Sequence, residues 1–446
     1  MPCISQELFS RIILVCLMVL TVANQATTME NLSVLHNVSD ASAPTATQLY
    51  DCLKQQKVAR VVSYDGGGIR GIIPAIATKH LEDKIEQRLN DTFHLFAGTS
   101  TGGLIAAGLA IGKPSSEILR LYTDVGKSIF TKISFFRNIF RCFRSKYDAT
   151  PLEKAILGVC GDLKLSQVPN DLLVPYHDYS SGRPSFFKSH FARTINSNGS
   201  GMLLQNSSSP SDIDINSIIL RSPSSSDHVP KVINDYYMKD VLRTTCSAPT
   251  YFDPYYLQTV KQVETGSKSH VVGLDGGMFA NDPALYALTE AFNLYPRADA
   301  YFLLSFGTGK TNLLRTSEPR SLLKWGLEVP DIFMADIESS VRHMLKTLGL
   351  TYNKKVFYAR VNVDIPHEYS AMDNVSDKNL NYLMARAQEY IARDDAPINV
   401  VASALRFPVT PREEIIRAVD EKIDTNFMEI GRNFSLYAVR DFSQPC

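Results

Sequence analysis

Short apolar runs that end in glycine-rich loops constrain the fold of this chain more than any other feature. Two of them, Val58–Tyr64 and Phe93–Ala97, are each followed by a loop and then by a helical pattern, at 72–89 and 104–111. Strand, loop and helix repeated in this order favour an α/β fold with a central, mainly parallel sheet flanked by helices. Further strands are expected at Leu172–Tyr176, Val271–Leu274 and Tyr301–Phe306. The carboxyl ends of parallel strands share one edge, so we expect the loops to meet there.

The loop after the first run allows two interpretations when it is considered alone. Gly66, Gly68 and Gly71 follow the G-x-G-x-x-G spacing of a dinucleotide-binding turn, and Glu86 stands near the position that would contact a ribose. A purely structural glycine turn fits the same letters. The other glycine-rich loops are needed to choose between a dinucleotide-binding turn and a structural turn.

The second loop carries a candidate nucleophile. Gly98-Thr-Ser-Thr-Gly102 matches the nucleophile elbow, in which Ser100 stands between a strand and the amino end of a helix. The alternative is a glycine-rich packing turn. A nucleophilic serine also needs a base and donors for an oxyanion.

The two other loops offer those partners. Asp275 precedes Gly276 and Gly277 at a strand end, where it is a candidate base, although an Asp-Gly turn is the plainer interpretation. The amides of Gly66, Gly67 and Gly68 are suited to an oxyanion hole. Arg70 is a candidate phosphate contact, or else a surface or ion-pair residue.

Histidine is the rival base, because His343 and His367 follow Asp275 in the Ser, Asp, His order of ordinary α/β-hydrolases. Neither sits in a glycine turn at a strand end, and His343 falls in a helical pattern at 331–348. No His, Cys or carboxylate cluster has the spacing of a metal site, so we expect no metal and no cofactor.

Charge and composition restrict the partners. The 446 residues carry 46 Lys and Arg against 46 Asp and Glu, so no global field gathers nucleic acid. The stretch 130–147 alternates phenylalanines with lysines and arginines, which suits transient contact with an anionic membrane surface, although buried aromatics with solvated charges fit as well. The oligomeric state stays open.

The ends of the chain and one internal segment depart from the globular pattern. Residues 1–23 have the character of a signal peptide, with an apolar run at 12–22 that is short of the about 20 residues of a membrane span, although an uncleaved anchor is the alternative. A secreted or endomembrane location is expected, and N-x-S/T sequons agree with it. Residues 24–57 are expected to be a linker or a short N-terminal extension, 196–227 a Ser-rich insertion and 408–446 a tail. Five widely spaced cysteines outside the signal leave room for one disulfide.

Taken in order, DGGGIRG, GTSTGG and DGG resemble the motifs of the patatin-like phospholipases, plant lipid acyl hydrolases among them. SAPTYFDPYY at 247–256 and MDNVSDKNL at 372–380 are similar to patatin segments too. The resemblance implies a single patatin-like domain at 58–407 and a Ser100–Asp275 dyad without histidine. It also implies an oxyanion hole at Gly66–Gly68, an acyl-enzyme intermediate, and release of fatty acid from membrane phospholipid or galactolipid without calcium. A secreted storage or defence protein with weak residual esterase activity is the alternative.

Overall fold

The structure is a computed structural model, and it describes most of the central part of the chain. The described residues are 50, 54, 56–130, 145–197, 234–268, 271–311, 338–351, 354–394, 396–406 and 408–416. All of them fall in one compact unit. The expected signal peptide, nearly all of the Ser-rich insertion, residues 131–144 and residues 417–446 therefore lie outside the described residues.

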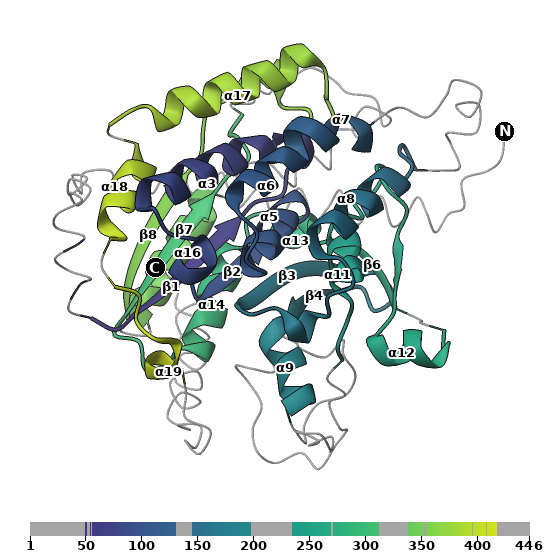
Figure 1. Ribbon diagram of the computed structural model, residues 1–446, viewed down its shortest axis with the longest axis horizontal. Helices are drawn as coiled ribbons and strands as arrows, with labels where there is room; N and C mark the ends of the chain where they lie inside the picture. The colour runs from purple at the N-terminus through teal and green to yellow at the C-terminus, as the bar shows by residue number, and fades with distance from the viewer. Residues whose placement is uncertain are drawn as a thin grey trace, which may run out of the picture. The chain divides into compact units, whose positions relative to one another are not determined.

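Eight strands of the described residues form one sheet, in the order β5-β6-β3-β2-β1-β7-β8, with β4 paired to β3 (Figure 1). Their bounds are β1 Val58–Tyr64, β2 Leu95–Gly98, β3 Asp171–Asp178, β4 Arg183–Lys188, β5 Tyr255–Leu257, β6 Val271–Asp275, β7 Ala300–Phe306 and β8 Lys355–Val361. The five strands from β3 to β8 along this path are parallel, whereas β4, β5 and β6 pair antiparallel. The central, mainly parallel sheet expected from the sequence is confirmed.

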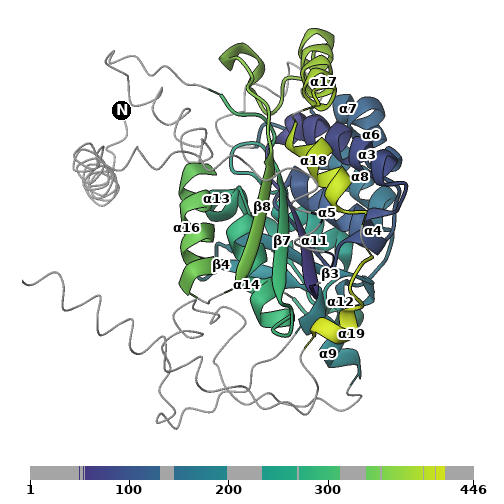
Figure 2. The ribbon, with the colours of Figure 1, turned by 90° about the vertical axis from the view of Figure 1, so that its left-hand side faces the viewer.

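Helices cover both faces of the sheet, and Figure 2 shows them on either side of β7 and β8. One face packs against α3 Ile72–Ile85, α5 Thr101–Ala110, α6 Ser115–Arg120, α8 Thr150–Cys160, α11 Met238–Thr245, α17 Asp377–Ile391 and α18 Pro397–Ala404. The other packs against α14 Ala284–Leu294 and α16 Glu338–Thr351. Strand β1 alternates between the two cores and is buried along its whole length, as expected of a central parallel strand.

Short elements connect these layers. They are η2 Gly68–Gly71, α4 Leu89–Thr92, a π-helix at Leu121–Val125, α7 Gly126–Ile129, η5 Leu165–Gln167, α9 Ser189–Ser197, α12 Val260–Thr265, α13 Gly277–Ala280, η6 His367–Tyr369 and α19 Arg412–Ile415. Within the described ranges, no helix has both the length and the apolar character needed to cross a membrane.

Two helix boundaries differ from the sequence expectation. The helix expected at 72–89 ends at Ile85, because Glu86 takes a left-handed conformation with φ 55° and its amide bonds back to the Glu82 carbonyl. The helix expected at 104–111 already begins at Thr101. Its first turn contains Gly102 and Gly103, which are poor helix formers in solution, so the packing of this turn overrides their intrinsic propensity.

Strand β6 is the main correction to the expected sheet. The strand at 271–274 was expected to bring its carboxyl end to the shared edge as a parallel strand does, but it pairs antiparallel with β3. Residues 176–178 of β3 pair with β4 on one side and β6 on the other, and Leu173 pairs with β4 and β2. Strands β2 and β6 therefore lie on the same side of β3 and meet with their carboxyl ends facing each other.

Strands β4, β5 and β8 were not expected from the sequence, and the packed chain also extends beyond residue 407. In the expected tail, the Thr410 hydroxyl accepts from the Val58 amide at 3.0 Å and Ile415 is fully buried. Arg412 reaches the first residue of β3, Asp171, at 3.0 Å. These contacts attach residues 408–416 to the amino ends of the parallel strands.

We expect Asp171→Ala to destabilise the protein strongly. Asp171 is fully buried, and its carboxylate accepts from the Tyr295 hydroxyl at 2.6 Å and pairs with Arg193 and Arg412. Removing one partner of a buried ion pair leaves charges uncompensated and costs about 3–5 kcal/mol. Urea unfolding measures the loss.

The matched control for this variant is Asp83→Ala. Asp83 forms an exposed ion pair with Lys79 at 2.5 Å, and such pairs contribute about 0–1 kcal/mol. Equal losses of unfolding free energy in the two variants would show that the Asp171 cluster does not hold the fold together.

Candidate active site

Ser100 occupies a strained turn between β2 and α5. Its backbone has φ 54° and ψ −124°, which is rare for a residue with a side chain. The turn is so tight that a Cβ at Gly98 would lie 2.1 Å from the Gly102 carbonyl oxygen, and a Cβ at Gly102 would lie 2.3 Å from that of Tyr64. The two glycines of the expected elbow are therefore required by close backbone approach.

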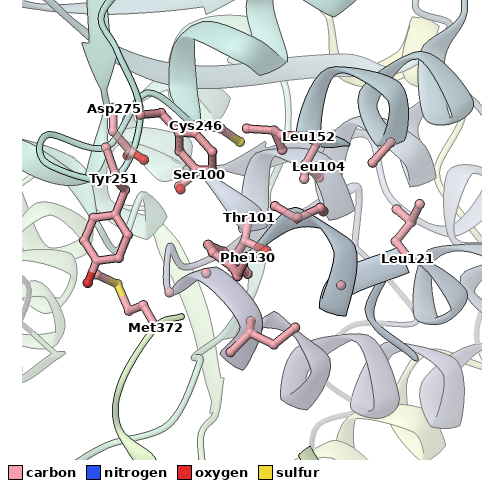
Figure 3. Close-up of a pocket in the computed structure, with 18 of the residues that line it drawn as sticks. Ser100, Thr101, Leu104, Leu121, Phe130, Leu152, Cys246, Tyr251, Asp275 and Met372 are labelled. Carbon is pink, nitrogen blue, oxygen red and sulfur yellow. The ribbon is translucent and has the colours of Figure 1, made fainter. Parts of the chain in front are cut away.

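Asp275 ends β6 and faces the elbow. Its carboxylate accepts from the Gly277 amide at 2.7 Å, and the side chain lies beside that of Ser100 at one end of a pocket (Figure 3). Gly276, at the start of the next turn, has no room for a side chain because a Cβ would lie 2.4 Å from the Pro175 carbonyl oxygen. The glycines after Asp275 thus let the chain turn away while the carboxylate stays in place.

The environment of Asp275 keeps its proton affinity high. Burial raises the pKa of its carboxyl from 3.8 to about 7, while the Gly277 amide and the Ser100 hydroxyl act in the opposite direction by favouring the charged form. A carboxyl with a pKa near neutrality can both take a proton and return it. Asp275 is therefore suited to act as a general acid and base.

The end of α11 supports both of these residues, which the sequence did not indicate. The Thr245 hydroxyl accepts from the Ser100 amide at 3.0 Å and donates to the Pro175 carbonyl at 2.7 Å. Two residues later, the Ser247 carbonyl accepts from the Asp275 amide at 3.0 Å. One short segment thus fixes the spacing of Ser100 and Asp275.

Between these two supports, Cys246 lines the pocket beside Ser100 (Figure 3). Burial raises the pKa of its thiol, so the side chain is neutral and serves as part of the wall. The thiols of Cys160 and Cys246 are both free. The other cysteines, which left room for one disulfide, lie outside the described residues.

The opening loop contributes fewer amides than the sequence suggested. The Gly66 amide donates to the Asn281 carbonyl at 3.0 Å, and the Ile69 amide donates to the Met372 carbonyl at 2.8 Å. Gly67 and Gly68 line the pocket, whereas Gly66 does not. Of the three glycines expected to form an oxyanion hole, Gly66 has its amide bonded to Asn281, and only Gly67 and Gly68 line the pocket.

Arg70 and Gly71 lie behind this loop. The Arg70 side chain is directed back towards the Gly67 carbonyl, with Nε at 3.5 Å, and Arg70 does not line the pocket. A Cβ at Gly71 would lie 2.6 Å from the Tyr122 ring. The glycines of the G-x-G-x-x-G spacing thus stand where close packing leaves no room for a Cβ.

The pocket runs from Ser100 and Asp275 into an apolar interior. Its empty space, with the open mouth included, is about 850 Å³, within the range of small-molecule sites. Figure 3 shows Leu104, Leu152 and Leu121 leading away from Ser100. Further lining residues are Ile129, Phe130, Ala155, Val159, Ala248, Tyr251, Phe252, Asn281 and Met372. This shape matches a polar reacting group attached to a long apolar chain.

The rival base residues lie elsewhere. His343 and His367 are exposed, and no histidine stands among the described residues that line the pocket. Among all the residues that the structure describes, no group of His, Cys, Asp and Glu could hold a metal ion. Of the 130–147 stretch, Phe130 lines the pocket and its ring packs against that of Tyr147, whereas 131–144 lie outside the described residues.

The chain is similar to several known proteins. A family model described as Patatin-like phospholipase matches residues 62–288, just over half of the 446 residues. Patatin-like protein 2 of Arabidopsis thaliana is 26% identical over 381 residues, which cover 76% of this chain and 84% of the relative. A cGAMP-activated phospholipase of Vibrio cholerae is 26% identical over 395 residues, covering 80% and 97%. The crystal structure of VipD from Legionella pneumophila aligns over 85% of this chain and 75% of its own, with a TM-score of 0.35 and 11% identity.

The matched region includes all three glycine loops and both residues of the Ser100–Asp275 pair. Its family supports lipid hydrolysis as the general activity of this protein. The chain belongs to the patatin-like phospholipase family.

Proposed function

We propose that this protein is a serine acyl ester hydrolase that releases fatty acid from membrane phospholipids or galactolipids. Ser100 is the nucleophile, Asp275 the general base, and the amides of Gly67 and Gly68 stabilise the oxyanion. The observation that carries this proposal is the position of Ser100 beside a buried Asp275 at the end of an apolar pocket. The family assignment does not favour the alternative of a storage or defence protein with weak residual activity.

The acylation step needs only these groups. Asp275 takes the proton of the Ser100 hydroxyl as Oγ attacks the ester carbonyl carbon, and the carbonyl oxygen becomes an oxyanion beside Gly67 and Gly68. When the tetrahedral intermediate collapses, Asp275 returns the proton to the leaving alkoxide of the glycerol. The acyl group is then bound as an ester to Ser100.

Deacylation repeats the sequence with water as the nucleophile. Asp275 takes a proton from the water, a second oxyanion forms, and the proton passes to Ser100 Oγ as the fatty acid leaves. A base with a pKa near 7 suits both steps, because it is ionised when it must accept a proton and acidic enough to return it. No third residue is needed for the proton balance.

The apolar interior would hold the acyl chain during both steps. Its walls come from α5, the π-helix, α7 and α8, through residues such as Leu104, Leu121, Ile129 and Leu152. Burial contributes about 0.8 kcal/mol for each methylene removed from water, so a long chain is strongly favoured over a short one. The headgroup would remain near the mouth of the pocket.

Three expectations stay predictions from the sequence. Membrane contact through 130–147 depends mostly on residues outside the described ranges, and so does the secreted or endomembrane location that residues 1–23 indicate. Arg70 as a phosphate contact gains no support from its orientation towards the Gly67 carbonyl.

Ser100→Ala should abolish ester hydrolysis and covalent labelling by a fluorophosphonate while the circular dichroism spectrum stays unchanged. The change removes the attacking oxygen and little else, so turnover should fall by at least about 10³-fold. Ser403→Ala is the matched control, because that exposed serine lies on α18 and does not line the pocket. Wild-type turnover in folded Ser100→Ala would refute the mechanism.

The pH dependence should report the ionisation of Asp275. Below pH 7 the carboxyl holds its proton and cannot accept another, so kcat/KM for a soluble neutral ester should fall about tenfold per pH unit. Above pH 7, kcat/KM should no longer change with pH. Histidine would give a similar midpoint, so His343→Ala and His367→Ala serve as controls and should keep the wild-type profile. A profile that becomes flat in either variant would make that histidine the base.

Ala155→Phe should shorten the acyl chains that the enzyme accepts. Ala155 lines the pocket from α8, and a phenyl ring there would occupy space meant for the distal methylenes. We expect kcat/KM for a palmitoyl ester to fall at least about tenfold relative to a butyryl ester. The neighbouring exposed Lys154→Phe is the control. Equal losses for both esters in Ala155→Phe would contradict an acyl site in this part of the pocket.

A further inference from the structure

A buried ion cluster lies directly behind the opening loop. Asp65 is the residue between β1 and Gly66, and its two carboxylate oxygens accept from Arg360 of β8 at 2.9 and 2.5 Å. Both side chains are more than nine-tenths buried. A two-point contact between a guanidinium and a carboxylate fixes orientation as well as distance.

The sheet makes room for this contact in one row of residues. Ser63, Ser305 and Arg360 are register partners on β1, β7 and β8, so their side chains lie on the same face. The two serines are small, which lets the arginine extend over β7 towards Asp65. The Arg360 guanidinium also donates to the Ser305 hydroxyl at 2.6 Å.

The same guanidinium reaches the segment that follows Asp275. It lies 3.4 Å from the carboxylate of Asp282, whose other oxygen accepts from the Ala284 amide at the start of α14 at 2.9 Å. The residue before it, Asn281, accepts the Gly66 amide through its carbonyl. Asp65 precedes Gly66, and Asp282 follows Asn281. Arg360 therefore contacts the neighbours of both residues that form the Gly66–Asn281 hydrogen bond.

Stability alone does not account for such a cluster. Burying two carboxylates and a guanidinium removes three ions from water, and well-packed apolar residues often replace such groups at no loss of stability. What the ions provide here is a fixed geometry for the Asp65–Gly66 and Asn281–Asp282 segments. The next residues along the loop, Gly67 and Gly68, line the pocket beside Ser100.

We propose that Arg360 is a positioning residue of the active site, which holds Asp65 and Asp282 so that the Gly67 and Gly68 amides point at the oxyanion. This role rests on the proposed function, since it acts through the oxyanion hole assigned there. A displacement of about 1 Å in a reacting group can lower turnover about 100-fold. Arg360 acts on the transition state without touching the substrate.

Arg360→Lys is the most direct test, because lysine keeps the positive charge and loses the two-point contact. The measurements are kcat and KM for a soluble butyryl ester, and the Ki of a trifluoromethyl ketone. This inhibitor adds to a serine Oγ and forms an oxyanion, so its Ki for active enzyme reports the oxyanion hole and does not depend on how much enzyme is folded. Arg386→Lys is the matched control, since Arg386 is a partly exposed arginine of α17 paired with Glu389.

In Arg360→Lys we expect kcat to fall about 10- to 100-fold with KM within twofold, and Ki to rise by the same factor as kcat/KM falls. Arg386→Lys should leave all three values unchanged. Ser305→Ala removes one contact of the guanidinium without unpairing a charge, and a smaller parallel change of about three- to tenfold is expected. If Arg360→Lys does not fold, Ser305→Ala is the variant that tests the proposal.

A Ki within twofold of wild type in folded Arg360→Lys or Ser305→Ala would overturn the positioning role, even if turnover had fallen. The underlying function has its own control in Ser100→Ala. Wild-type turnover in that variant would reject the proposed function itself. An inactive Ser100→Ala together with a normal Ki in Arg360→Lys would reject only the role of Arg360.

Discussion

The end-to-end meeting of β2 and β6 is the constraint on which the site depends. Both strands lie on the same side of β3 and run towards each other, so the residues just beyond their ends share one small volume. Ser100 follows one end and Asp275 stands at the other. If β2 and β6 were parallel strands, Ser100 and Asp275 would lie at the same edge of the sheet but at the ends of two different strand positions. Because β2 and β6 instead share one position beside β3 and point towards each other, Ser100 and Asp275 lie next to each other.

Burial of Asp275 raises the pKa of its carboxyl and also has a cost in stability. The folded protein releases this proton near pH 7, whereas an unfolded chain releases it near 3.8. Below pH 3.8 the carboxyl is neutral in both states and the folded state loses nothing. As the pH rises from 3.8 to 7 the ionised form becomes favoured only in the unfolded chain, so folding stability decreases across that window and levels above it. The pH range in which Asp275 is ionised, as the proposed mechanism requires, is therefore a range in which this residue destabilises the fold.

The sequence predicted the parts of the site that depend on local chain geometry. The elbow around Ser100 and the turn after Asp275 require glycine at fixed neighbouring positions, so the glycine pattern of the sequence indicates both turns. The direction of β6 cannot be predicted in this way, because the short apolar run Val271–Leu274 fits a parallel or an antiparallel strand equally well. Gly66 was expected to offer its amide to the oxyanion, but that amide bonds to Asn281, more than 200 residues away. Thr245 and Arg360 were missed for the same reason: each makes a contact between distant segments, and nothing in its immediate sequence marks it.

Two clusters of buried aspartate paired with arginine lie at opposite ends of the parallel strands and act differently. At the amino ends, Arg193 and Arg412 surround Asp171 and attach residues 408–416 to the sheet, far along the strands from the pocket. At the carboxyl ends, Arg360 connects two segments that are already held by backbone hydrogen bonds. Loss of the first would release a piece of chain, whereas loss of the second would leave two buried carboxylates unpaired next to segments that backbone hydrogen bonds still hold. An ion pair buried where the backbone is already fixed is thus better explained by the geometry of the site than by the stability of the fold.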